Sequence, residues 1–155
     1  MTGERAQIIE ELRAAAQRGT MFTVLLHHAT ATKAGLNVTD AQCINALTLD
    51  GPQTPGRLAQ LMGITTGGAI TAVVDRLEKA GYVRRSRDPD DRRRVIIELV
   101  PEAVARFSDY FEPIARSFAG LVADYDDDRL RLLLEWMRAS NARMPGVIEQ
   151  VRDLP

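Results

Sequence analysis

Apolar residues recur through most of this chain at spacings of three and four, the period of an α-helix that buries one face. Over residues 4–34 the apolar stripe begins with Ile8 and Leu12. It resumes with Phe22 after Gly19. The first stretch of the chain is therefore predicted to be helical.

The segment VTDAQCINALTL predicts a second helix. It opens with Thr39 and has Gln42 three residues later, which is the signature of a capping box. It closes at Asp50-Gly51-Pro52, a turn cluster that cannot continue a helix.

Two short helices with their own caps are predicted next. In TPGRLAQLMGI, Thr54 suits the N-cap, a proline follows it, and Gly63 suits the left-handed position after the helix end. In TTGGAITAVVDRLEKAG, the cap is Thr65 or Thr66, and Gly81 ends the helix. The stripes expected to face the core are Leu58, Leu61 and Met62 in the first and Ile70, Val73, Val74 and Leu77 in the second. Two capped helices joined by a tight turn that contains glycine are typical of a helix-turn-helix.

The pattern then changes to the period of two that marks a β-strand. Val95, Ile97 and Leu99 alternate with Arg94, Ile96 and Glu98. Asp88-Pro89-Asp90-Asp91 supplies turn residues between this strand and YVRRSR. A β-hairpin with an apolar base and an arginine-rich tip is predicted.

Helical periodicity returns at Pro101 and continues to the end of the chain. An apolar seam at alternating steps of three and four comprises Val104, Phe107, Phe111, Ile114, Phe118, Leu121 and Tyr125. Pro113 lies inside this predicted helix, where it should kink the backbone by removing one hydrogen bond. Residues 126–128 restart a helix whose apolar face is Leu130, Leu133, Leu134 and Met137.

Composition narrows the class of protein. The chain has 155 residues and is 45% hydrophobic, which suits a globular protein of one domain or two small lobes. No stretch approaches the roughly 18 apolar residues of a membrane span, and the acidic, amphipathic start is unlike a signal peptide. A single cysteine, Cys43, excludes an internal disulfide, so a cytoplasmic location is expected.

The distribution of charge is more informative than its sum of −1. Residues 1–53 carry 4 basic and 5 acidic side chains, residues 54–100 carry 9 and 6, and residues 101–155 carry 7 and 10. Six arginines and three aspartates lie within the eleven residues from Arg84 to Arg94. Such crowding requires full solvation or an anionic partner.

A helix-turn-helix followed by a charged hairpin predicts a winged helix that binds double-stranded DNA. The second helix would enter the major groove, and the hairpin arginines would contact phosphates or the adjacent minor groove. The predicted groove-facing residues are Thr65, Thr66, Gly67, Gly68, Thr71, Ala72 and Arg76, with Thr54 beside them. The predicted wing residues are Arg84, Arg85, Arg87, Asp91, Arg92, Arg93 and Arg94. Taken alone, the hairpin is also typical of a solvated edge that resists strand pairing.

Three segments carry a resemblance to a known family. GLNVTDAQCINAL, TPGRLAQLMGITTGGAITAVVDRLEKAGYVRR and DPDDRRRVIIEL resemble the MarR family of bacterial transcriptional regulators. By this resemblance, Arg93 enters the minor groove and Asp91 orients it. The resemblance also implies a homodimer joined through its N- and C-terminal helices, a roughly palindromic operator, and release of DNA by a small aromatic or phenolic effector. The residues that would bind an effector are unknown.

Some positions depart from the family pattern. Gly68, Ala69 and Ala72 stand where relatives often carry Ser, Thr or Arg, so readout is expected to rely on close backbone approach, threonine hydroxyls and contact with thymine methyls. Arg57 replaces a frequent glutamate and is predicted to add a phosphate contact.

Other residues admit a structural or a functional role. Cys43 lies on an apolar stripe and is expected to be buried, although a redox switch is the alternative. No other metal-ligating residue is spaced to complete a site with His27 and His28. If these histidines have a function, it is expected to be contact with an effector. The aromatic series favours a core or dimer seam over an effector pocket.

The predicted fold class is mostly α with a small β-hairpin wing, in one MarR-type domain over residues 1–155. A winged helix-turn-helix lobe at about 37–100 is flanked by dimerisation helices at about 4–34 and 101–150. The predicted function is a DNA-binding transcriptional regulator that acts as a repressor. An enzyme is disfavoured because the sequence lacks a Gly-rich cofactor loop, a nucleophile–base pair and a metal-ligand cluster. No catalytic residue, metal or cofactor is expected. The alternatives are a winged helix that binds protein, or a dimerisation domain attached to an enzyme.

Overall fold

The computed structural model describes residues 3–155, apart from the side chains of Val104, Arg106 and Phe107. Two positions of the predicted C-terminal seam, Val104 and Phe107, thus lie outside the described side chains. The chain divides into two compact units, one ending at Phe111 and the other beginning at Glu112.

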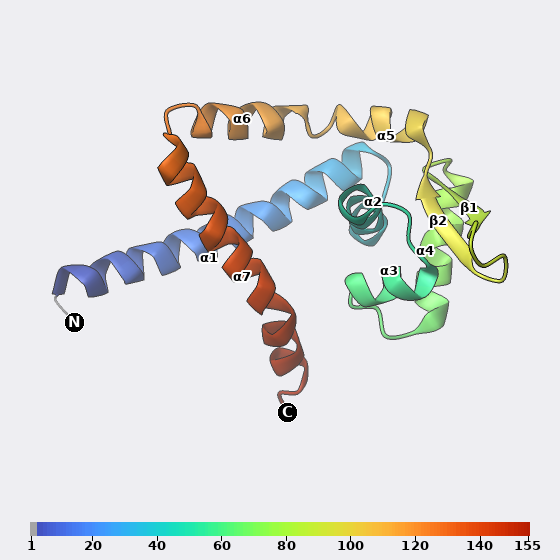
Figure 1. Ribbon diagram of the computed structural model, residues 1–155, viewed down its shortest axis with the longest axis horizontal. Coiled ribbons are helices and arrows are strands. Elements are labelled where there is room, and N and C mark those ends of the chain that lie inside the picture. The colour runs from blue at the N-terminus through green and yellow to red at the C-terminus, as the bar shows by residue number, and fades with distance from the viewer. Residues whose placement is uncertain (1–2) are drawn as a thin grey trace. The chain divides into compact units, whose positions relative to one another are not determined.

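The first unit combines helices with a two-stranded antiparallel sheet, which confirms the predicted fold class. Its elements are α1 (Gly3–Lys33), α2 (Val38–Asp50), α3 (Pro55–Leu61), α4 (Gly67–Lys79), β1 (Val83–Arg87), β2 (Val95–Leu99) and α5 (Pro101–Ser108). In Figure 1, α2, α3, α4 and the hairpin are gathered together, while α1 extends away from them. Residues 37–100 are called the winged lobe from here on.

One apolar core holds the winged lobe together. Its largest fully buried side chains are Cys43 and Ile44 of α2, Leu58 of α3, Val74 and Leu77 of α4, Val83 of β1 and Ile97 of β2. The predicted stripe of α4 is buried along its length, and Leu58 is buried in α3, whereas Leu61 is exposed. Because every element contributes to the same core, the hairpin is packed against the helices.

The hairpin register places the predicted apolar strand positions inward. Val83 pairs with Leu99 at the base, and Arg87 pairs with Val95 next to the tip. Gln53 adds an isolated bridge to Ile97, with N···O distances of 3.0 and 2.8 Å. These backbone bonds tie the loop before α3 to the sheet.

Helix boundaries agree with the predicted caps in most places. Thr54 accepts a hydrogen bond from the backbone N–H of Arg57 at 3.2 Å. Gly63 and Gly81 have φ angles of 64° and 75°, as expected after a helix end.

The predicted capping box of α2 is wrong. Asn37, two residues before Thr39, is the N-cap, and its side chain accepts from the backbone N–H of Asp40 at 2.8 Å. An Asn side chain satisfies an unpaired N–H of the first turn as well as a threonine does, so α2 begins earlier than the sequence pattern indicated.

The second unit contains α6 (Glu112–Val122) and α7 (Asp127–Arg152). The single kinked helix predicted from Pro101 is wrong, since α5 ends at Ser108 and α6 begins at Glu112. Pro113 therefore lies in the first turn of a new helix, where its missing N–H leaves no intrahelical bond unmade. Asp126 caps α7 through the backbone N–H of Arg129 at 2.9 Å, which confirms the predicted restart.

Apolar side chains of α7 remain at the surface. Leu133, Leu134 and Met137 are exposed, and Leu130 is half-buried. Among the described residues, no helix combines the length and apolar character needed to span a membrane.

Candidate nucleic-acid interface

The α3–turn–α4 segment forms the predicted helix-turn-helix. The turn closes where the backbone N–H of Ile64 donates to the carbonyl of Ala59 at 2.8 Å, next to the left-handed Gly63. The buried stripe of α4 fixes which face of that helix points inward. The opposite face is consequently held at the surface of the winged lobe.

The first two turns of α4 present a surface of small side chains. The predicted groove-facing residues Thr65, Thr66, Gly67, Gly68, Thr71 and Ala72 are all exposed. A Cβ atom added at Gly67 or Gly68 would meet nothing within 4 Å, and neither glycine has a positive φ. The fold itself does not require glycine there, although glycine costs a helix about 1 kcal/mol relative to alanine.

The threonines of this surface differ in their hydrogen bonding. Thr66 occupies the N-cap position, but its side chain makes no capping hydrogen bond. The hydroxyl of Thr71 donates to the carbonyl of Gly67 at 3.1 Å, so its lone pairs can still accept a hydrogen bond. This surface therefore offers methyl groups, acceptors and backbone N–H groups.

Arg76 binds a carboxylate of its own lobe. Its guanidinium group donates to both carboxylate oxygens of Asp40 of α2, at 3.2 and 2.7 Å, while its side chain stays 48% exposed. The pKa of Arg76 is raised, primarily by this hydrogen bond. The sequence contained a signal for the pair: Asp40 lies four and seven residues before Ile44 and Leu47, on the buried stripe, where a carboxylate needs a cation.

Two wing arginines also have carboxylate partners within the lobe. Arg85 of β1 binds Asp75 at 2.5 Å and also binds Glu78, both on α4. Arg84 binds Glu98 across the sheet at 3.0 Å, and this contact is the main cause that lowers the pKa of Glu98. These three carboxylates were not among the site residues predicted from the sequence.

The hairpin tip, residues 88–94, is organised by two aspartates. Asp88 accepts from the backbone N–H groups of Asp90 and Asp91, at 2.9 and 3.3 Å. Asp91 accepts from the backbone N–H of Arg93 at 3.0 Å. Asp91 thus holds the backbone from which Arg93 projects.

Most of the remaining arginine charge of the lobe lies at this tip and at Arg87, directly before it. Within the part of the chain that the structure describes, Arg87, Arg92 and Arg93 form no ion pair. Arg87 donates to the backbone carbonyl of Arg92 at 3.3 Å, and Arg94 lies 3.8 Å from Asp88. All four arginine side chains are exposed.

Strand β1, which leads to the hairpin tip, runs along α4. Because Arg85 in the middle of β1 contacts Asp75 and Glu78, the strand runs back along α4 toward its first turn. In Figure 1, the hairpin tip lies at the right edge of the lobe and the α3–α4 turn at its lower edge. Arg57 of α3 is also exposed, and it donates to Gln60 at 2.7 Å.

The cysteine is buried, as its position on the α2 stripe predicted. Cys43 is fully buried, and burial raises the pKa of its thiol to about 11. At neutral pH it is protonated and therefore a poor nucleophile.

The two histidines differ in exposure: His27 is half-buried and His28 is exposed. In the described part of the chain, no group of three or more His, Cys, Asp or Glu residues is placed to hold a metal ion.

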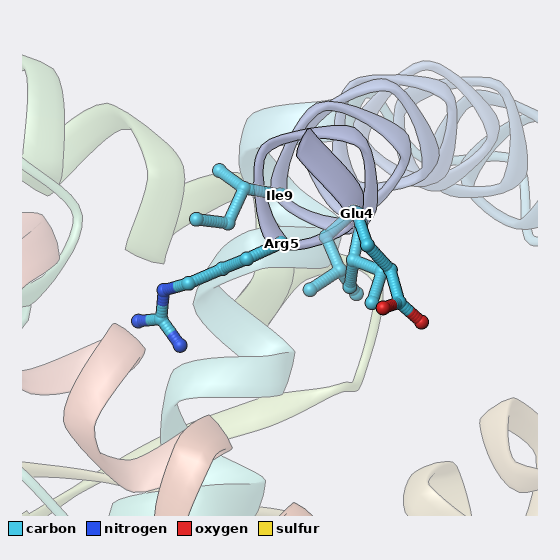
Figure 2. A pocket seen from close by; sticks show the side chains of 5 residues that line it. Glu4, Arg5 and Ile9 are labelled. Carbon is cyan, nitrogen blue, oxygen red and sulfur yellow. The ribbon is translucent and has the colours of Figure 1, made fainter. Parts of the chain in front are cut away.

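A surface hollow near the start of α1 is formed by residues of that helix alone. Glu4, Arg5, Ile8, Ile9 and Leu12 line it. All five residues are exposed and belong to one helix (Figure 2), so they form part of the open surface of α1.

Comparison with known proteins identifies the family. The sequence model described as MarR family matches residues 34–94. YcgE of Bacillus subtilis (strain 168), described as an uncharacterized HTH-type transcriptional regulator, is 38% identical over 130 residues, which are 84% of this chain and 84% of the relative. The chain belongs to the MarR family. It is therefore a transcriptional regulator and not an enzyme.

Solved structures share the fold. A MarR family protein from Bacillus stearothermophilus has a TM-score of 0.69 at 21% identity, covering 94% of this chain and 99% of that one. Reduced AbfR bound to DNA has a TM-score of 0.52 at 19% identity, covering 93% of this chain and 99% of that one.

Proposed function

We propose that this MarR family protein is a homodimeric repressor that binds a pseudo-palindromic DNA operator. Two features of one lobe support the proposal: the exposed face of small residues at the start of α4, and a hairpin tip whose arginines form few ion pairs with the described residues, on a strand that Arg85 attaches to α4. Reduced AbfR, which has the same fold, was solved bound to DNA, and this supports the choice of DNA over a protein partner. We also propose that the protein is located in the cytoplasm, where a bacterial chromosome lies.

In this proposal, the first turns of α4 enter the major groove. Thr65, Thr66, Gly67, Gly68, Thr71 and Ala72 approach the base edges. Thr54 and Arg57 lie at the start of α3 and contact the flanking phosphates. Backbone N–H groups at the start of α4 add attraction for phosphate.

The hairpin tip supplies most of the phosphate neutralisation. Arg87, Arg92 and Arg94 contact phosphates, and Arg93 enters the minor groove with its backbone held by Asp91. Arg84, Arg85 and Arg76 contribute less because each already binds a carboxylate of its own lobe.

A second copy of the chain would cover the exposed apolar residues of α1, α6 and α7. In α1 the exposed residues Met21, Phe22, Val24, Leu25 and Leu26 lie within six consecutive positions. At about 100° per residue, they cover more than one face of the helix, and such a helix is stable only when buried on several sides. Phe118 and Leu121 of α6 and Leu133, Trp136 and Met137 of α7 are exposed as well. We infer that the segments at about 4–34 and 101–150 form the dimer and complete one functional domain with the winged lobe.

Repression follows from occupancy. A dimer whose two recognition helices lie in successive major grooves covers the intervening DNA and excludes other proteins from it. A winged helix that binds only protein is the rival function.

Selection of bound sequences from random duplexes tests the proposal. We expect two inverted half-sites about 10 base pairs apart from centre to centre, and a two-chain species in sedimentation. Absence of any enriched sequence, together with absence of a salt-dependent shift of duplex DNA, would favour the protein-binding rival.

Replacing Arg93 with alanine should weaken binding most on operators with A·T-rich flanks, because a narrow minor groove concentrates negative potential. If the wild-type dimer neutralises about 6–10 phosphates, its affinity should fall about 10³–10⁵-fold between 50 and 200 mM salt. Arg93→Ala removes one guanidinium group from each subunit, so the slope of log K against log salt should decrease by about 2. The control is Arg84→Ala, whose slope should stay near wild type because Glu98 already holds Arg84. Equal slopes for wild type and Arg93→Ala contradict the assignment.

The half-sites should be read through thymine methyl groups. Replacing a contacted thymine with uracil removes one methyl group and should cost about fourfold in affinity, from about 0.8 kcal/mol per buried carbon. Replacing guanine with 7-deazaguanine removes the acceptor that a bidentate arginine uses and should change little. Thr71→Val should alter the base preference because it removes the hydroxyl acceptor. The opposite pattern in the base substitutions would show that a long side chain reads the groove.

Gly68→Ala tests the close approach of α4 to the bases without changing the stability of the free protein. The added methyl group meets open space in the free protein, so the free energy of unfolding should not fall. Affinity for the operator should fall, because the methyl group would stand between α4 and the floor of the groove.

We also propose that a small aromatic or phenolic ligand controls the regulator. The separation of α5 from α6, at the boundary of the two units, supports this, because a ligand can act only by preferring one arrangement of the dimer.

Phenolic compounds should raise the melting temperature of the protein and release the operator in a binding assay. Uniformly flat responses would indicate control by protein abundance alone.

A further inference from the structure

The Asp40–Arg76 pair joins two helices that are otherwise held by apolar contacts. Asp40 lies in the first turn of α2 and Arg76 in the last part of α4. The side chain of Asp40 is only 5% exposed, whereas that of Arg76 is 48% exposed. The buried carboxylate needs its cation, because an unpaired buried charge is strongly unfavourable.

The geometry of this contact restricts α4 in a way that the core does not. Ile70, Val73, Val74 and Leu77 hold α4 against the lobe, but apolar burial is non-directional and tolerates small rotations. A guanidinium group that donates from Nε and Nη2 to two carboxylate oxygens fixes an orientation as well as a distance. Rotation of α4 about its axis would break at least one of the two bonds.

The rotation matters because of what lies on the outer line of α4. Gly68 and Ala72 are four residues apart, opposite the buried stripe, and thus project together from the helix. Asp75, three residues further, lies on the same line and carries negative charge. A small rotation would replace the methyl and glycine surface at the groove with a different set of side chains.

We propose that Arg76 is a positioning residue rather than a phosphate contact. It sets the rotation of α4 against α2 through Asp40, so that the Gly68–Ala72 line faces the bases. This role rests on the proposed DNA-binding function and adds a determinant of its specificity.

The two roles of Arg76 predict opposite effects of Asp40→Asn. If Arg76 serves a phosphate, removing the carboxylate frees its charge, and DNA binding becomes tighter and more salt-dependent. If Arg76 is a positioning residue, the same change loosens α4, and specific binding weakens. Asn has nearly the shape of Asp, so the comparison changes charge with little change in packing.

The experiment uses the full-length protein with its selected operator and a random duplex, across a salt series, well below the melting temperature. Asp40→Asn and Arg76→Gln should each weaken specific binding by about tenfold, within the range of couplings in a shared network. The double variant should bind the selected operator no more weakly than the single variant that has the lower affinity, because both changes remove the same contact. Affinity for the random duplex and the salt slope should remain at wild-type values, in contrast to Arg93→Ala.

A second double variant separates positioning from stability. Asp40→Leu combined with Arg76→Met replaces the ion pair with apolar side chains, which often preserves or raises stability. We expect a melting temperature at or above wild type but a lowered ratio of specific to random-duplex affinity. Full specific affinity in this variant would overturn the positioning role.

The remaining outcomes are also decisive. Tighter binding by Asp40→Asn, or a salt slope reduced by about 2 in Arg76→Gln, would overturn the positioning role and assign Arg76 to phosphate. Failure of the wild-type protein to prefer any duplex would instead remove the proposed function, and the positioning role with it.

Discussion

The positive charge of the winged lobe has to be neutralised. Some arginines pair with carboxylates of the lobe and others remain unpaired at the surface, and this division determines how the lobe is built. Arg76 is held by Asp40, Arg85 by Asp75 and Glu78, and Arg84 by Glu98. Each of these arginines joins two different elements. Among the described residues of the lobe, Arg57 of α3 forms no ion pair, and neither do Arg87, Arg92 and Arg93 at or next to the hairpin tip. Since a crowded cluster of unpaired arginines attracts an anion, the hairpin tip is the proposed place for DNA phosphates.

Much of the fold follows from the chain's apolar periodicity and its punctuating residues. Thr54, Gly63 and Gly81 lie at helix ends as predicted, because each satisfies a local backbone requirement that the neighbouring sequence defines. The hairpin is also local, with turn residues directly between two strands. These elements could be located without knowledge of tertiary contacts.

The incorrect predictions arose where two local signals competed, and one contact was not predicted because the partner residue is distant in the sequence. Thr39 and Gln42 fit a capping box, but Asn37 captured the first turn of α2 before them. Pro113 is compatible with a kink or with a new start, and the pattern of apolar positions does not choose between them. The partner of Arg76 lies 36 residues away, so periodicity within α4 placed that side chain on the outer face without revealing its contact.

The pairs also explain how a carboxylate can be tolerated beside the proposed DNA surface. Asp75 continues the outer line of Gly68 and Ala72 and would repel phosphates if its charge were free. Arg85 offsets that charge and simultaneously attaches the wing to α4. One arginine thereby permits the helix to approach a polyanion and attaches to that helix the strand that leads to the hairpin tip. In the proposed complex, affinity resides in the tip and sequence readout in the first turns of α4. The ion pairs of Arg85 attach the strand that leads to the tip to the same helix.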